Sequence, residues 1–133
     1  MIHALRSDSA PWEIRRVGSE FFYQRGRTDI VAVTEAGKVF AFEAKLIKWR
    51  EALNQAYRNC CFAHRSFVVL PRDTAIRASQ YCDAFSLRGV GICYVDKGRL
   101  VVLQDAKESE PMEPFLFNRA LNHIEKQAID EPC

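Results

Sequence analysis

Two acidic residues and one lysine lie in parts of the chain that are otherwise apolar. Asp29 belongs to the run TDIVAVT, whereas Glu43 and Lys45 belong to the run KVFAFEAKL. Two carboxylates that meet in a dry environment repel one another, so a positive charge must compensate them. A divalent cation such as Mg²⁺ or Mn²⁺, which prefers oxygen ligands, is one candidate, and the Lys45 ammonium alone is another. A third alternative is that all three side chains are solvated at the edge of a sheet.

The residues between the two runs decide whether the acids meet. Residues 35–37, Glu-Ala-Gly, suit a three-residue hairpin loop with glycine at the left-handed position. A loop of this length places Asp29 opposite Glu43 on the antiparallel neighbour, with Cβ atoms about 4.5–5.5 Å apart. Since side chains alternate along a strand, Lys45 lies on the same face as Glu43. The sequence therefore predicts that three ionisable groups share one patch of sheet.

The remaining segments predict an α/β fold in which a mixed central sheet is flanked by helices. Apolar residues recur at helical spacing from Trp49 to Ala63, and residues 66–71 form an apolar run that ends at a proline. Residues 12–27 favour a strand that Gly18 interrupts. Further strands are expected at 90–96 and 99–105, and further helices at 73–89 and 115–128.

Length and composition indicate a soluble globular protein. The 133 residues correspond to a single domain, for which we expect a core over about residues 20–105 and a separate C-terminal helix. A net charge of +2 neither demands nor excludes a nucleic-acid partner. The five cysteines include no CxxC pair, and the N-terminal residues hold no apolar run long enough for a signal peptide or membrane helix. We therefore expect a cytoplasmic protein with reduced cysteines and no membrane partner.

The acids and the lysine resemble the motif of the PD-(D/E)xK phosphodiesterase superfamily, whose members share the restriction-endonuclease-like fold. That motif has an acid at the start of one central strand, here Asp29, and E/D-x-K on the antiparallel neighbour, here residues 43–45. Many members then carry a helix with a glutamine near the site, which Gln55 in WREALNQAYRN matches. The resemblance spans about residues 20–96.

The chain departs from the family pattern at two places. Thr28 stands where a proline often precedes the first acid. The family usually has an N-terminal helix with a further acid, but only about a dozen residues precede Trp12. Glu20 or Glu13 could supply that acid instead.

The resemblance implies a metal-dependent nuclease that hydrolyses phosphodiester bonds in DNA with Mg²⁺ or Mn²⁺. Asp29, Glu43 and the backbone carbonyl of Ala44 would bind the metal. Lys45 would assist the attacking water, and its ammonium would be held by the two acids when metal is absent. Gln55 would orient Lys45, the water or the substrate.

Positive residues surround the proposed site and fit contacts with DNA phosphates. They are Arg25, Arg27, Lys48, Arg50 and Arg58. Two other functions remain open: a non-catalytic nucleic-acid-binding or assembly subunit that retains the fold, and an unrelated α/β regulatory domain in which Glu43 and Lys45 form a surface pair. The resemblance also makes a homodimer or a partner subunit an expectation.

Overall fold

The computed structural model describes residues 1–7, 10–24 and 26–130. In these ranges six strands form one sheet whose spatial order follows the chain. The strands are β1 (Ile14–Tyr23), β2 (Gly26–Thr34), β3 (Val39–Ala44), β4 (Arg65–Val69), β5 (Gly91–Asp96) and β6 (Arg99–Gln104). The β1–β2, β2–β3 and β5–β6 pairs are antiparallel, whereas β3–β4 and β4–β5 are parallel. The predicted mixed sheet is therefore confirmed.

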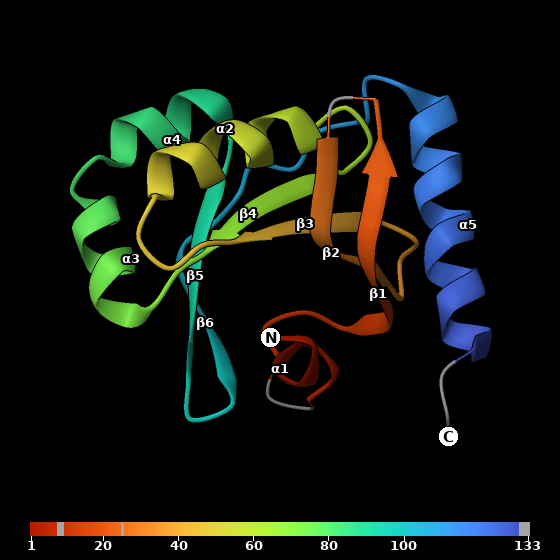
Figure 1. The fold of residues 1–133 in the computed structure, drawn as a ribbon, viewed down its shortest axis with the longest axis horizontal. Coiled ribbons are helices and arrows are strands. Elements are labelled where there is room, and N and C mark those ends of the chain that lie inside the picture. Colours follow the sequence, from red (N-terminus) through yellow and green to blue (C-terminus); the bar gives the residue numbers. More distant parts are fainter. Residues whose placement is uncertain (8–9, 25, 131–133) are drawn as a thin grey trace.

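Helices cover both faces of the sheet, as Figure 1 shows. They are α1 (Ile2–Arg6), α2 (Trp49–Asn59), α3 (Arg72–Ser79), α4 (Cys82–Arg88) and α5 (Pro114–Asp130). Helices α2 to α5 share one face, and α1 lies on the other. None of the helices in the described part of the chain is both long and apolar enough to cross a bilayer.

The predicted hairpin between β2 and β3 is confirmed. Gly37 adopts a φ of +81° and donates its backbone N–H to the Thr34 carbonyl at 2.9 Å. The Thr34 N–H in turn donates to the Lys38 carbonyl at 2.9 Å, which fixes the predicted pairing. The register then continues as far as Ile30 opposite Phe42. This register carries Asp29 and Glu43 to the same end of the sheet.

The face that α1 covers is rich in aromatic side chains. Trp12 packs against Phe40, Phe42 and Phe67, with ring centroids 5.3, 5.9 and 4.9 Å away. Leu5 of α1 is buried against the same cluster. A fully buried phenylalanine contributes roughly 1.5–3 kcal/mol to stability, so this layer anchors the central strands.

The opposite face is covered in two parts. Helix α5 packs on β1 to β3, where Ile124 is fully buried, and helices α2 to α4 pack on β4 and β5, where Phe85 is fully buried. Helix α2 runs alongside both β3 and β4, so its inner face looks onto the strand end that carries Glu43.

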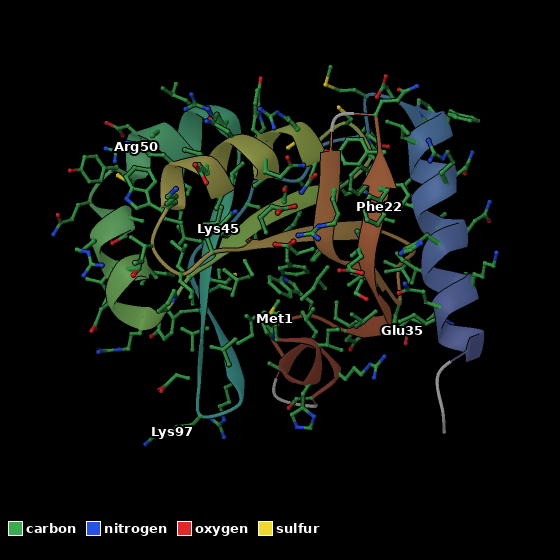
Figure 2. All side chains as sticks on the ribbon, viewed as in Figure 1. Met1, Phe22, Glu35, Lys45, Arg50 and Lys97 are labelled. Carbon is green, nitrogen blue, oxygen red and sulfur yellow. The ribbon has the colours of Figure 1, made fainter. Side chains whose placement is uncertain are left out.

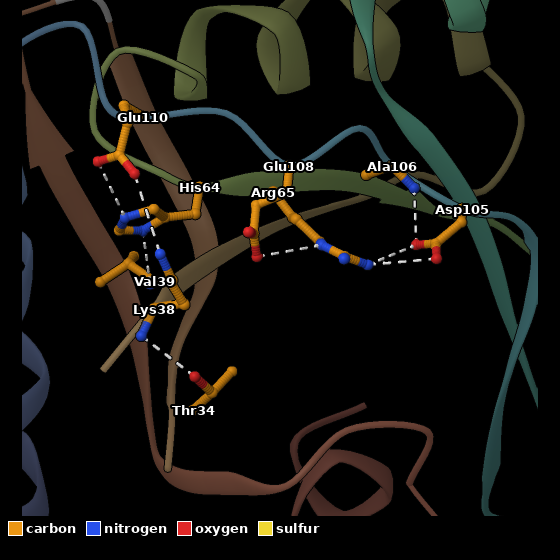
Figure 3. Close-up of polar contacts among 9 residues, drawn as sticks. All are labelled: Thr34, Lys38, Val39, His64, Arg65, Asp105, Ala106, Glu108 and Glu110. Carbon is orange, nitrogen blue, oxygen red and sulfur yellow. Dashed lines mark hydrogen bonds and ion pairs between the residues drawn. The ribbon is translucent and has the colours of Figure 1, made fainter. Parts of the chain in front are cut away.

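The polar segment between β6 and α5 is held against the sheet by charged and polar contacts (Figure 3). Arg65 is 3.1 Å from the Asp105 carboxylate and 3.7 Å from that of Glu108. The buried His64 accepts the Val39 N–H through Nδ1 at 3.2 Å, and its Nε2 is 3.9 Å from Glu110. These contacts hold the segment between β6 and α5 near the start of β4, and α5 then packs against β1.

Three predicted boundaries are wrong. β1 is not interrupted at Gly18, which pairs with Val31; the missing side chain instead lets α5 approach, because a Cβ there would lie 3.4 Å from the Ile124 Cα. The sheet also begins at Ile14, upstream of the expected core, and the predicted strand 12–27 turns at Gln24.

The two central helices are shorter than their periodicity indicates. The helix expected to reach Ala63 ends at Asn59, after which the chain turns and buries Phe62. The helix expected over 73–89 is broken between α3 and α4, where Tyr81 donates its N–H to Ala78 in a tighter turn. The tighter turn lets the Tyr81 ring pack 5.2 Å from that of Trp49.

Gly91 is predicted to be essential for the packing of β5. A Cβ at this position would lie 2.5 Å from Phe67 Cδ1 and 2.7 Å from the Gln104 carbonyl oxygen. We expect Gly91→Ala to lower the free energy of unfolding by about 3 kcal/mol in urea titrations, because neither the ring nor the backbone can move freely. Gly37→Asn is the matched control, since a Cβ there meets nothing within 4 Å and asparagine tolerates positive φ. Equal stability of the two variants would contradict this account.

Candidate active site

The ends of β2 and β3 bring Asp29 and Glu43 together. The ladder between the strands ends at the Ile30–Phe42 pair. Beyond it, the Ala44 N–H donates to the Asp29 carboxylate, at 2.9 Å from Oδ2, instead of to a backbone carbonyl of β2. The two strands therefore separate where the acids lie, and Asp29 and Glu43 meet just beyond the last pair of the predicted register.

A buried amide holds the Glu43 carboxylate in place. Asn59, the last residue of α2, is fully buried and donates its Nδ2–H to Glu43 Oε1 at 3.0 Å. Its Oδ1 accepts the hydroxyls of Tyr23 at 2.6 Å and Thr28 at 2.9 Å. Gln55 donates to the same oxygen and to the Tyr23 hydroxyl, both at 3.2 Å. A buried amide left without partners costs about 1–3 kcal/mol, so this network fixes both the amide orientation and the carboxylate.

Glu43 is only 3% exposed, and its ionisation is correspondingly perturbed. Burial raises the pKa of this carboxyl from 4.5 to about 7, the Asn59 hydrogen bond opposes the rise, and the Asp29 carboxyl adds to it. Burial also raises the pKa of the Tyr23 hydroxyl, which keeps its proton and remains a donor to Asn59. None of the ion pairs among the described residues includes Glu43. The site thus holds two carboxyls with a deficit of positive charge.

The acids open onto a cleft of about 430 Å³ between the strand ends and α2. Its wall carries acidic, basic and amide side chains and little apolar surface. The residues that line it are Arg27, Asp29, Glu43, Ala44, Lys45, Glu51, Asn54, Gln55 and Arg58. Most of the predicted catalytic and metal-binding residues therefore border one space.

Lys45 lies in the cleft but not where the sequence placed its ammonium. β3 ends at Ala44, and the Lys45 Nζ is 4.0 Å from the Glu51 carboxylate on α2. Glu51 is also 3.9 Å from the Lys48 ammonium, so one carboxylate faces two lysines. The expectation that Asp29 and Glu43 hold Lys45 is wrong, because the strand has ended and the helix offers an exposed acid. Figure 2 shows Lys45 at this junction, on the side of α2.

Gln55 acts on the site through the buried network. Besides its contacts with Tyr23 and Asn59, its Oε1 accepts a hydrogen bond from Arg58 at 3.2 Å. None of its described hydrogen bonds reaches Lys45, so the prediction that it orients the lysine is not supported by a contact.

The predicted DNA-contacting residues fall into separate groups. Arg27 and Arg58 line the cleft, and Arg27 Nη2 is 3.3 Å from Asp29. Neither Lys48 nor Arg50 lines the cleft: Lys48 pairs with Glu51, and the Arg50 guanidinium stacks 4.2 Å above the Trp49 ring. Arg25 lies outside the described residues.

Glu20, the suggested further acid, does not line the cleft. Its side chain is largely exposed and 3.7 Å from Arg27, which thus bridges it to Asp29. Glu20 has a φ of +51°, uncommon for a residue other than glycine, and the flanking register places it opposite Asp29. Side chains of a regular strand alternate between its two faces, so Gly18 and Phe21, three residues apart, should face opposite sides. Both face α5, so the irregularity at Glu20 changes which side chains of β1 point toward that helix. This shift aims the Tyr23 hydroxyl at Asn59.

The donor set fits a magnesium-like cation. Mg²⁺ in proteins is bound by one or two carboxylates and takes its other ligands from water and substrate phosphates. Asp29 and Glu43 supply two carboxylates at one point, next to the backbone of Ala44. The described residues contain no cluster of three or more His, Cys, Asp or Glu that could hold a metal.

Sequence reasoning missed four residues of the site. They are Tyr23, Thr28, Glu51 and Asn59. Asn59 had a usable signal, because it lies four residues after Gln55 and so shares its face of α2. Glu51 had the same signal, because it lies four residues before Gln55. Tyr23 and Thr28 had none, since their roles depend on the shifted strand and on the helix approaching the strand end.

The ionisation of Glu43 predicts a dependence of stability on pH in metal-free protein. The folded state holds a proton on Glu43 up to a pKa of about 7, whereas the unfolded state loses it near 4.5, so stability falls as pH rises through this window. We expect a loss of roughly 2 kcal/mol, less than the full shift implies because the carboxyl borders an open cleft. Urea titrations in EDTA between pH 4.5 and 8 measure this loss. Glu43→Gln should abolish it, and Glu51→Gln should not.

Known proteins resemble this chain in fold but not in sequence. No protein-family model and no curated protein matches the chain. A solved structure of SPO1766, a protein of unknown function from Silicibacter pomeroyi, aligns with 86% of this chain and 74% of its own, at a TM-score of 0.65 and 16% identity. SfsA from Pyrococcus furiosus in complex with Ca²⁺ matches at a TM-score of 0.40 and 9% identity, over 71% of this chain and 55% of its own. A repair endonuclease from Pyrococcus abyssi matches at a TM-score of 0.43 and 15% identity, over 74% of this chain and 39% of its own. The chain thus has a mixed α/β fold similar to that of SPO1766.

Proposed function

We propose that this protein is a Mg²⁺- or Mn²⁺-dependent nuclease that hydrolyses phosphodiester bonds in DNA. The observation that carries the proposal is the meeting of the Asp29 and Glu43 carboxyls at the mouth of a polar cleft, with no cation of the described chain paired to Glu43. The resemblance to the PD-(D/E)xK motif assigns the same residues. A divalent cation bound here would supply the missing charge and lower the pKa of bound water.

The residues of the chain have distinct parts in this proposal. Asp29 and Glu43 bind the cation, with the Ala44 carbonyl as a further ligand. Asn59 holds the Glu43 carboxylate in a fixed orientation, and Tyr23 and Gln55 hold Asn59. Such supporting hydrogen bonds typically contribute 10-fold to 100-fold in metal affinity or activity.

Positive side chains in the cleft favour a polyanionic substrate. Arg27 and Arg58 border the acids from β2 and α2, and Lys45 borders them from the end of β3. A phosphate that enters can exchange with the Glu51 carboxylate as the partner of Lys45, because both sides of this pair are exposed and the pair is weak. Lys45 then stabilises negative charge on the reacting phosphate and assists the attacking water.

A second candidate is a nucleic-acid-binding or assembly subunit that retains the fold without catalysis. The contact between Lys45 and Glu51 favours it, because a lysine neutralised by a helix acid is withdrawn from chemistry. Binding and cleavage must therefore be measured separately.

Cation binding is the first test. We expect Mn²⁺ titrated into the protein to give a calorimetric binding signal, since the two carboxyls converge and no cation of the described chain is paired with Glu43. Glu43→Gln and Asp29→Asn should each weaken the affinity by more than about tenfold. Lys45→Met should leave it unchanged, because Lys45 pairs with Glu51 rather than with the acids. Absence of a signal from the parent would contradict the cation site.

Cleavage is the second test. Supercoiled plasmid incubated with Mg²⁺ or Mn²⁺ should be nicked or linearised, and gel assays should show a rate decrease of about 100-fold or more for Asp29→Asn, Glu43→Gln and Lys45→Met. Glu35→Gln in the exposed β2–β3 loop is the control and should cleave like the parent. Binding of Mn²⁺ and DNA without cleavage would support the second candidate instead.

A further inference from the structure

Two further hollows lie on the described surface besides the cleft, and they differ in chemistry. One, of about 630 Å³, shares Ala44 and Lys45 with the cleft and is otherwise lined by aliphatic residues and Pro71. The other, of about 320 Å³, lies between β1 and α5 and is lined by Phe21, Phe22 and polar or basic residues of α5. Only the second combines aromatic rings with cations within the described residues that line these hollows.

One cross-strand pair links the second hollow to the cleft. Phe22 lies directly opposite Arg27 in the β1–β2 register, and Arg27 lines the cleft. Phe22 is 63% exposed, an unusual fraction for a phenylalanine on a regular strand. Figure 2 shows Phe22 at the β1 end of the sheet, on the side toward α5.

Arg119 of α5 lies between the Phe22 backbone, the buried Phe21 ring and the exposed Phe115 ring. Its guanidinium donates to the Phe22 carbonyl at 3.4 Å. It also lies 5.9 Å from the centre of the Phe21 ring and 6.0 Å from that of Phe115, which is 72% exposed. Lys126, one further residue of this hollow, adds a second cation from the same helix. We call Phe22, Phe115, Arg119 and Lys126 the aromatic-basic path.

We propose that the aromatic-basic path binds an unpaired nucleic-acid strand whose phosphodiester backbone continues into the cleft. This inference rests on the proposed function, because it assumes that the cleft receives a phosphodiester group. It adds the substrate class: a single-stranded region, or a junction with one, rather than a continuous duplex.

The reason lies in what each form of nucleic acid exposes. In a duplex the base faces are stacked on one another, so a protein meets mainly phosphates, sugars and base edges. In an unpaired strand the faces are free, and exposed aromatic rings flanked by cations bind them by stacking while the cations contact phosphates. Glu20 is the acidic residue that lines this hollow, and its Oε1 is 3.7 Å from Nη1 of Arg27. The remaining charges, Arg119 and Lys126, suit a polyanion.

Binding to two fluorescent oligonucleotides tests the inference without cleavage. The protein carries Glu43→Gln and is kept in EDTA, and fluorescence anisotropy compares a 16-nucleotide oligo-dT with a hairpin duplex of the same number of phosphates. We expect the single strand to bind at least tenfold more tightly. Phe22→Ala should weaken single-strand binding by about 5-fold to 100-fold and leave duplex binding unchanged.

Two variants separate stacking from loss of structure. Phe22→Trp should retain single-strand binding, because it keeps an aromatic ring at the same exposed position. Leu87→Ala, at a residue of α4 that is 85% exposed and away from the path, should bind like the parent. Equal binding of single strand and duplex, or an unaltered affinity in Phe22→Ala, overturns the inference.

The remaining outcomes distinguish this inference from the proposed function. If plasmid cleavage by the parent is confirmed but Phe22 has no effect on binding, the nuclease stands and the aromatic-basic path is discarded. If cleavage is absent but single-strand binding depends on Phe22, the path stands and the protein is a binding subunit. If Phe22→Ala instead converts a dimer to a monomer in sedimentation and leaves oligonucleotide binding unaltered, the patch joins two copies of this chain and the inference is wrong.

Discussion

The hydrogen bond from Asn59 to Glu43 is the interaction on which the rest of the site depends. It joins the end of α2 to the end of β3, and it fixes a carboxylate that burial and Asp29 would otherwise favour in the protonated form. The strength of such a bond comes from its surroundings, because a donor and an acceptor removed from water cannot be exchanged for solvent. The packing of α2 against β3 and β4 is therefore also what keeps the acids in place.

Around this bond, charges are arranged in two separate systems. The inner one contains Asp29 and Glu43 and lacks a lysine partner. The outer one contains Lys45, Lys48 and Glu51, all of them exposed, and it is weakly held. An arrangement of this kind keeps the inner acids available to a cation while the outer side chains can rearrange when a ligand arrives.

The sequence predicted the sheet and the opposed acids because both follow from local signals. Side chains of β2 and β3 alternate between the two faces of the sheet, and Gly37 sets the length of the loop between them. Together they fix a register that does not depend on distant residues. The pairing of Lys45 with Glu51, the end of α2 at Asn59 and the irregularity at Glu20 could not be predicted in this way. Each of them depends on how a helix meets a strand, or on a backbone conformation that no residue type demands.

The strictly sequential order of the strands has a consequence for how the molecule assembles. Every strand pairs with its neighbours in the chain, so the sheet can grow one strand at a time through hairpins and the two helical crossovers that flank β4. Helix α5 departs from this order, because its contacts with β1 join residues as far apart as Arg15 and Glu125, which are 110 positions apart. During synthesis the outer edge of β1 therefore stays open until α5 has left the ribosome. In that interval the nascent sheet is most exposed to pairing with another polypeptide.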